Sequence, residues 1–265
     1  MVETNTIQFI RDFSEKYLAG NLDNLADFRL AKLKDDKVFG CPGRSFDPDD
    51  TEIMRCIYVA LFSDVWPGLS DDTIKSGIFR GDTLNTYNTL FGRPDELSVH
   101  PGLDRFETSN ELRMKNATFR VHFSQIGNMT VLPNLRVNGK SINTYRGCHA
   151  QWRDYFDRFL FALRDILVGS DSVDAGLLEL VAANDRFFAH YKGSDGFKIL
   201  VDSLYLNDYV DADYNPIVSS KGYFFWKGGL SSSDYEAEAS RYIDFSNMVI
   251  EHRTFLMIER LKAIL

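Results

Sequence analysis

Apolar side chains that recur at the spacing of an α-helix are the feature that most limits how this chain can fold. In residues 152–167 charged side chains occupy one helical face, and the opposite stripe consists of Phe156, Phe159, Leu160, Leu163, Ile166 and Leu167. Similar stripes run through residues 173–191 and 196–208. Residues 235–265 are predicted to form one long helix, or two with a kink. The sequence therefore predicts a predominantly α-helical protein.

A period of two replaces the helical period near the middle of the chain. Phe119, Val121 and Phe123 alternate with polar residues, as in a strand, and residues 129–132 form a second short candidate. The dipeptide Asn138-Gly139 then indicates a turn. We expect an α+β fold, mostly helical, with a small central β element around residues 117–135. With 265 residues and no convincing linker, the chain is predicted to be a single domain over residues 1–265.

The distribution of charge singles out one segment. The whole chain has 38 Asp and Glu against 30 Lys and Arg, a net charge of −8, which argues against a general polyanion-binding surface. Residues 113–153 contain none of those acids, although they hold Arg113, Lys115, Arg120, Arg136, Lys140, Arg146 and Arg153. Cations among Asn, Ser, Thr and Gly donors are what an anion site needs, and arginine suits phosphate. Alternatively, these cations pair with acids elsewhere in the fold.

Catalytic and metal-binding motifs give few signals. The five histidines include no HExxH motif and no pair four residues apart, and no cysteine or serine has a signalled partner, so no metal site or nucleophile is predicted. His122 and His149 flank the acid-free segment and are candidates for proton transfer. A cluster of acids in residues 202–213 could hold Mg²⁺, although solvated acids at a helix end explain it as well. The sequence leaves open whether the protein is an enzyme.

Three cysteines without a CxxC spacing, Cys41, Cys56 and Cys148, fit reduced thiols in a cytoplasm. The N-terminal residues lack the pattern of a signal peptide, and no run of 18 apolar residues occurs. We therefore expect a cytoplasmic protein that neither spans nor binds a membrane.

Four stretches in a fixed order resemble a family of uncharacterised bacterial proteins, known only as a domain of unknown function. They are "FRGDTLNTYNTLFGR" (79–93), "IGNMTVLPNLRVNGKSINTYRG" (126–147), "RDYFDRFLFALRDIL" (153–167) and "DSLYLNDYVDADY" (202–214). The resemblance covers roughly residues 60–215. It implies a bacterial cytoplasmic domain and no particular activity.

A weaker likeness joins "IGNMTVL" to the HNH-type nuclease domain of modification-dependent restriction enzymes. Those domains have an Asp- or Glu-His-Ile motif upstream, which this chain lacks. A degenerate HNH-like nuclease is therefore an alternative, but this chain lacks the motif that supplies the catalytic base and the residue next to the metal in those domains.

The family pattern marks polar residues that packing alone does not explain. We predict that Arg80, Asn85, Asn128, Asn143 and Arg146 line a pocket for a phosphate-bearing small molecule or a nucleic-acid end. Asp82 is expected to orient Arg80, or to hold Mg²⁺ if the protein is catalytic; otherwise it caps a helix at residues 83–91. Binding alone requires no cofactor.

An interaction module without a small-molecule ligand is the other class of function. The aromatic stretch Tyr223–Trp226 is then the predicted contact surface, because aromatic side chains anchor interfaces. A homodimer through residues 235–265 is a further expectation.

Overall fold

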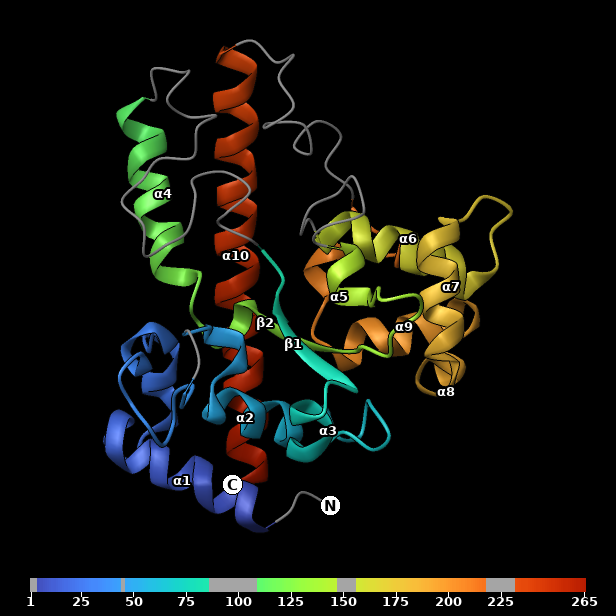
Figure 1. Ribbon diagram of the computed structural model, residues 1–265. Helices are drawn as coiled ribbons and strands as arrows, with labels where there is room; N and C mark the ends of the chain where they lie inside the picture. The colour runs from blue at the N-terminus through green and yellow to red at the C-terminus, as the bar shows by residue number, and fades with distance from the viewer. Residues whose placement is uncertain (1–3, 44–45, 86–108, 147–155, 218–231) are drawn as a thin grey trace.

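One long helix forms the axis of the molecule. The computed structural model describes residues 4–43, 46–85, 109–146, 156–217 and 232–265. Helix α10 (Ser232–Ile264) runs the length of the structure as a single helix, with α4 (Asn110–His122) beside one part and α2 (Glu52–Phe62) beside another (Figure 1). Its buried residues include Ile243, Val249, Ile250, Met257 and Leu261. The predicted C-terminal helix is thus confirmed without a kink.

The remaining helices form two groups on either side of the strands (Figure 1). One group contains α1 (Thr4–Leu18), α2 and α3 (Asp71–Lys75), with short 3-10 turns that include η3 (Pro48–Asp50). The other contains α5 (Ile142–Thr144), α6 (Phe156–Val168), α7 (Ala175–Ala183), α8 (Asp185–Phe188) and α9 (Gly193–Ser203). The helical predictions at 152–167, 173–191 and 196–208 correspond to α6, to α7 with α8, and to α9; residues 152–155 lie outside the described part.

The two strands form a single antiparallel pair among the described residues. Strand β1 (Phe79–Thr83) pairs with β2 (Met129–Pro133), with Arg80 opposite Leu132 and Asp82 opposite Thr130. The predicted small β element is therefore present, and its strand at 129–132 is confirmed. The turn after β2 is confirmed as well: Asn138 and Gly139 have φ of 50° and 78°, and Val137 bridges Lys140.

The expected strand at residues 119–123 is wrong. These residues form the last turns of α4, which begins after Ser109, whose hydroxyl accepts a hydrogen bond from the backbone N–H of Leu112. Phe119 is fully buried and packs edge-on against Tyr242 of α10. Burial of one aromatic side chain against a neighbouring helix outweighs the local alternation of apolar and polar residues.

A turn pressed against α10 positions β2. In the turn η5 (Ile126–Asn128), the backbone N–H of Gly127 donates to Thr254 Oγ1 over 3.1 Å. A Cβ atom at Gly127 would lie 2.2 Å from the carbonyl oxygen of Ile250, so only glycine allows this approach. Arg253 of α10 lies beneath the same turn and is 0% exposed. It donates to the carbonyl oxygens of Gly127 (2.8 Å), Met129 (2.5 Å) and Leu204 (3.0 Å).

Replacing Arg253 with methionine should lower the free energy of unfolding by about 3 kcal/mol or more, because three buried carbonyl groups lose a charged donor. Urea denaturation measures the change. Arg260→Met on the exposed side of α10 is the matched control and should change stability by no more than about 0.5 kcal/mol. Equal stability of the two variants would contradict a structural role for Arg253.

Candidate functional site

Two of the predicted site residues form a buried hydrogen-bonded pair. The side-chain oxygen of Asn128 accepts from the backbone N–H and the side-chain amide of Asn85, at 2.9 and 3.3 Å. Its NH₂ group donates to the carbonyl oxygens of Asn85 and Phe123, both at 2.9 Å. Asn128 is 0% exposed, and its amide has used its two donors and both lone pairs. This pair therefore joins the end of β1 to the start of β2.

Three further predicted residues meet at β1. The buried Arg146 guanidinium forms an ion pair with Asp82 through Nη2 and donates to the carbonyl oxygen of Thr83 over 3.0 Å. Asn143 Nδ2 donates to the same Asp82 oxygen over 2.6 Å. The guanidinium also lies over the Phe156 ring, 5.6 Å from its centre. Arg146 is 0% exposed, so a phosphate could contact its guanidinium only if neighbouring side chains moved.

Two of the three expectations for Asp82 need correction. It pairs with Arg146 rather than orienting Arg80, because α5, which precedes Arg146, packs against β2, the partner strand of β1. It caps no helix, since Asp82 and Thr83 belong to a strand. Residues 86–91 of the expected helix lie outside the described residues.

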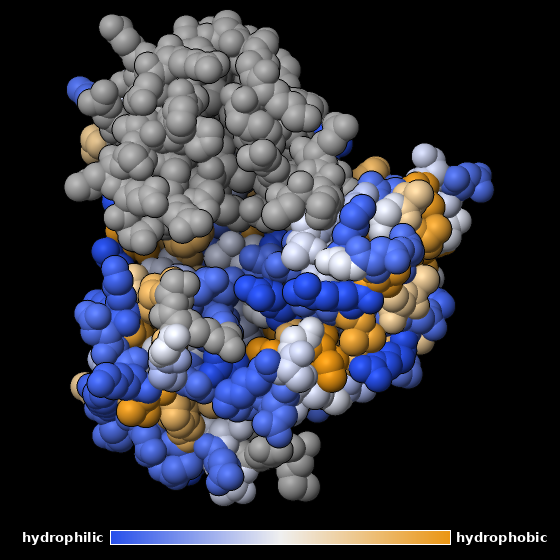
Figure 2. Space-filling model, in the orientation of Figure 1, coloured by the Kyte–Doolittle hydropathy of each residue, from blue (hydrophilic) through white to orange (hydrophobic). Residues whose placement is uncertain are grey.

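Arg80, the last predicted ligand residue, lines an open cleft of about 500 Å³. The cleft lies where α3, β1 and the exit of β2 meet, and Figure 2 shows a band of hydrophilic residues across this part of the surface. Three cations surround it: Lys75 at the end of α3, Arg80 on β1 and Arg136 after β2. The remaining lining residues are Asp50, Ile74, Ser76, Gly77, Ile78, Phe79, Gly81, Asn134 and Leu135.

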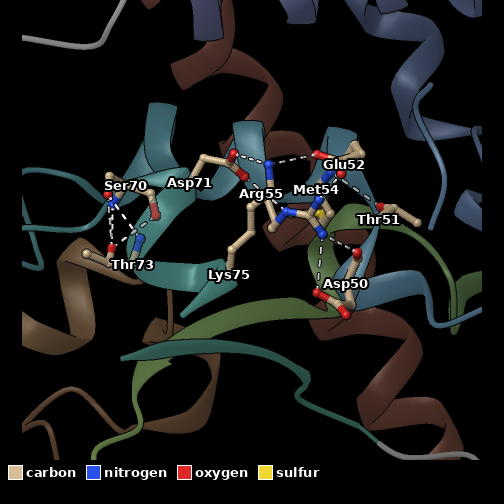
Figure 3. Close-up of polar contacts among 9 residues, drawn as sticks. All are labelled: Asp50, Thr51, Glu52, Met54, Arg55, Ser70, Asp71, Thr73 and Lys75. Atoms are coloured by element: carbon tan, nitrogen blue, oxygen red, sulfur yellow. Dashed lines mark hydrogen bonds and ion pairs between the residues drawn. The ribbon is translucent and has the colours of Figure 1, made fainter. Parts of the chain in front are cut away.

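A buried arginine fixes the wall that carries Lys75 (Figure 3). Arg55 of α2 is 5% exposed. It forms ion pairs with Glu52, with Asp50 (3.3 Å) and with Asp71 (3.0 Å), and it donates to the Asp50 carbonyl oxygen over 2.7 Å. Lys75 in turn contacts Asp71 over 2.5 Å. Arg55 contacts all three carboxylates, and Arg55 with Lys75 brings two positive charges to three negative ones on this wall.

The other two cations are not neutralised by carboxylates. Arg80 and Arg136 are exposed, and neither has an acidic partner within ion-pair distance in the described part of the chain. Asp49 lies on the neighbouring turn η3. Burial raises the pKa of its carboxyl well above the ordinary value, and the charges of Asp47 and Asp82 act in the same direction, whereas the charge of Arg80 acts in the opposite one.

Gly81 explains why β1 can hold Arg80 at this cleft. A Cβ atom at Gly81 would lie 2.5 Å from the carbonyl oxygen of Asp49 and 2.8 Å from the Tyr58 ring. Only glycine lets the strand lie this close to η3 and α2. Arg80 and Asp82, the two charged residues of the Arg80-Gly81-Asp82 sequence, are therefore held in place by a tightly packed strand.

A comparison with protein families assigns the chain to a known group. Residues 103–256, more than half of the sequence, match the model of a family of unknown function, DUF6994. The protein belongs to this family. No curated protein and no solved structure matches the chain. Within the stretch matched to DUF6994 lie Asn134 and Arg136 of the cleft, whereas Lys75 and Arg80 precede it.

Other predicted residues do not meet at the cleft. His122 contacts Asn247 (3.0 Å) and Glu251 (3.5 Å) on α10, and His149 lies outside the described residues. No set of three or more His, Cys, Asp or Glu side chains in the described ranges is arranged to hold a metal ion. In the acidic cluster at 202–213, Asp208 pairs with His252 over 2.8 Å.

The predictions for a partner surface remain untested. The aromatic stretch 223–226 falls outside the described ranges, and the homodimer stays a prediction. No described helix is long and apolar enough to cross a membrane.

Sequence reasoning missed Lys75, Asn134 and the role of Arg55. Lys75 closes a short helix that starts at a capping box between Ser70 and Thr73, and that pattern could have revealed the helix. Nothing in the sequence brings it beside Arg136, 61 positions further on. The sequence shows Arg136 as one cation of the acid-free segment, but it does not distinguish Arg136 from the cations that acids neutralise.

Asp82→Asn should lower the free energy of unfolding by about 3 kcal/mol, because it leaves the buried Arg146 charge without its counter-ion. Chemical denaturation tests this. Asp171→Asn removes an exposed carboxylate and is expected to be neutral within about 0.5 kcal/mol. If both variants proved equally stable, the Arg146–Asp82 pair would have no role in holding β1.

Proposed function

We propose that this protein binds a phosphate-bearing ligand in the cleft between α3, β1 and the exit of β2. The observation that carries the proposal is the exposure of Arg80 and Arg136 on one cleft, without carboxylate partners among the described residues. A guanidinium donates two parallel hydrogen bonds to a phosphate, and Lys75 adds a third cation. Binding a phosphate requires only the positive charge of these three side chains and no positive charge on the rest of the protein.

The overall charge of −8 does not oppose such a site. At physiological ionic strength, charges separated by more than about 8 Å of water are largely screened, so an anion in the cleft responds to nearby groups. The single acid on the lining is Asp50, and Arg55 holds its carboxylate. The lining carries three cations and one carboxylate, a formal charge of +2.

Within this proposal the predicted residues divide into two roles. Arg80 contacts the ligand, as the sequence suggests, together with Arg136 from the acid-free segment. Asn85, Asn128, Asn143 and Arg146 hold the strand that carries Arg80 and the strand that precedes Arg136, since their polar groups bond to neighbouring chain segments. Direct contact between Arg146 and the ligand would require the side chains that bury its guanidinium to move.

Binding is favoured over hydrolysis as the function of this cleft. Hydrolysis needs a positioned base or a metal ion near the phosphate. The one carboxylate on the lining is engaged by Arg55, and His122 lies against α10. The cations alone suffice to hold an anion, and Mg²⁺ enters only as a counter-ion of the ligand.

The melting temperatures of the wild type and of two variants, each measured with and without ligand, test the proposal. AMP and a 5′-phosphorylated dinucleotide, each with and without Mg²⁺, should raise the melting temperature of the wild type. At 100 times the dissociation constant the stabilisation is about 2.7 kcal/mol, or roughly 5–10 °C for a chain of this size. Arg136→Ala should weaken binding by about 10-fold or more and remove most of the shift.

Lys140→Ala is the matched control, because Lys140 is an exposed cation of the same segment that does not line the cleft. It should respond to ligand like the wild type. The proposal fails if no phosphate compound shifts the melting temperature, or if Arg136→Ala shifts as much as Lys140→Ala. The interaction-module alternative would then be the better account.

A further inference from the structure

One residue on the lining of the cleft has a buried side-chain oxygen that receives no hydrogen bond from the described part of the chain. Asn134, the residue directly after β2, is 4% exposed and belongs to the lining. Its side-chain oxygen has no partner among the residues that the structure describes. Buried polar atoms in proteins are nearly always bonded, so this oxygen requires an explanation.

The neighbours of Asn134 determine which atom of its side-chain amide is left without a partner. The side-chain NH₂ group donates to the carbonyl oxygen of Gly77 over 3.4 Å, and the backbone N–H donates to the carbonyl oxygen of Ile78 over 2.8 Å. A carbonyl oxygen only accepts, so the NH₂ group must face Gly77. Turning the amide over would set two acceptors against each other. The group left for a ligand is therefore an acceptor.

The rest of the lining suits an organic ligand better than a bare ion. The lining is mostly polar but includes the apolar residues Ile74, Ile78 and Leu135, which form its apolar wall. A volume of about 500 Å³ falls within the range of roughly 300–1,000 Å³ that small-molecule sites occupy. Inorganic phosphate would engage the cations and leave the apolar wall and the Asn134 oxygen unused.

We infer that the ligand is a phosphate monoester whose organic part offers a hydroxyl or amino donor to the side-chain oxygen of Asn134. Sugar phosphates and nucleotides share this chemistry. The phosphoryl group lies between Arg80 and Arg136, and the carbon skeleton packs on the apolar wall. Asn134 is thereby a specificity residue, because a ligand without the donor leaves its oxygen unpaired. This inference rests on the proposed function of the cleft.

Calorimetric titration of the wild type with two ligand pairs tests the inference. Ribose 5-phosphate is compared with tetrahydrofurfuryl phosphate, the same ring without hydroxyl groups, and AMP with purine riboside 5′-monophosphate, which lacks the amino group. In at least one pair the donor-bearing compound should bind ten times more tightly or better. The pair that shows the difference tells a hydroxyl donor from an amino donor.

Asn134→Ala should reduce that ratio to about one and leave the affinity for inorganic phosphate within about twofold, whereas Arg136→Ala should weaken every compound. If Asn134→Ala does not fold, Asn134→Ser takes its place and the wild-type ratios still decide. Equal affinities within both pairs would overturn the inference while phosphate binding stands. An absence of binding by all the compounds would overturn the proposed function itself.

Discussion

The buried guanidinium of Arg253 is the interaction on which the arrangement of the strands depends. One side chain on the central helix donates to carbonyl oxygens on both sides of η5 and at the end of α9. Burial lowers the pKa of Arg253 to about 10, which still leaves it charged at neutral pH. A buried charge is tolerated only where polar groups surround it, and here backbone carbonyls replace a counter-ion. The start of β2 is thereby fixed on α10, and β1 follows through its pairing with β2.

Ion pairs with acids elsewhere in the fold explain part of the charge pattern of the acid-free segment. Arg146 is neutralised by Asp82, and Lys115 by Asp244 (2.6 Å) and Glu111 (3.5 Å), so these cations pair with acids outside the segment. Arg136 remains exposed at the cleft beside Arg80. Among the described residues of the segment, Arg136 and Lys140 are exposed cations without a carboxylate within ion-pair distance, and of these two Arg136 lines the cleft. A local excess of positive charge is thus compatible with an acidic chain.

The sequence predicts the helices well because each buries one stripe, and Phe159 and Leu163 on α6 are examples. It misplaces a strand onto α4, where the alternation of Phe119 and Phe123 with polar residues also fits two turns of a helix that packs on α10. Strand β1 escapes prediction because it carries a charge at Arg80 and a glycine at the centre, and its conformation depends on the pairing with β2.

The candidate site could be predicted only in part. A sequence pattern marks polar residues that do something other than fill a core. In the structure Asn85 bonds to Asn128, and Asn143 and Arg146 both contact Asp82; their place on a ligand pocket stays a prediction. It cannot tell a residue that faces a ligand from one that bonds to the backbone of a distant segment. That distinction depends on which side chains remain exposed after packing, and Arg80 with Arg136 emerges only when α3 and the two strands meet.

Amide chemical shifts of the ¹⁵N-labelled protein during titration with AMP and with inorganic phosphate test the central claim most directly. The account predicts saturable shifts that are largest at residues 76–81 and 134–136, around the cleft. Residues 143–146 should change little, because Arg146 stays paired with Asp82. Shifts centred on 143–146, or no saturable shift at the cleft, would contradict it.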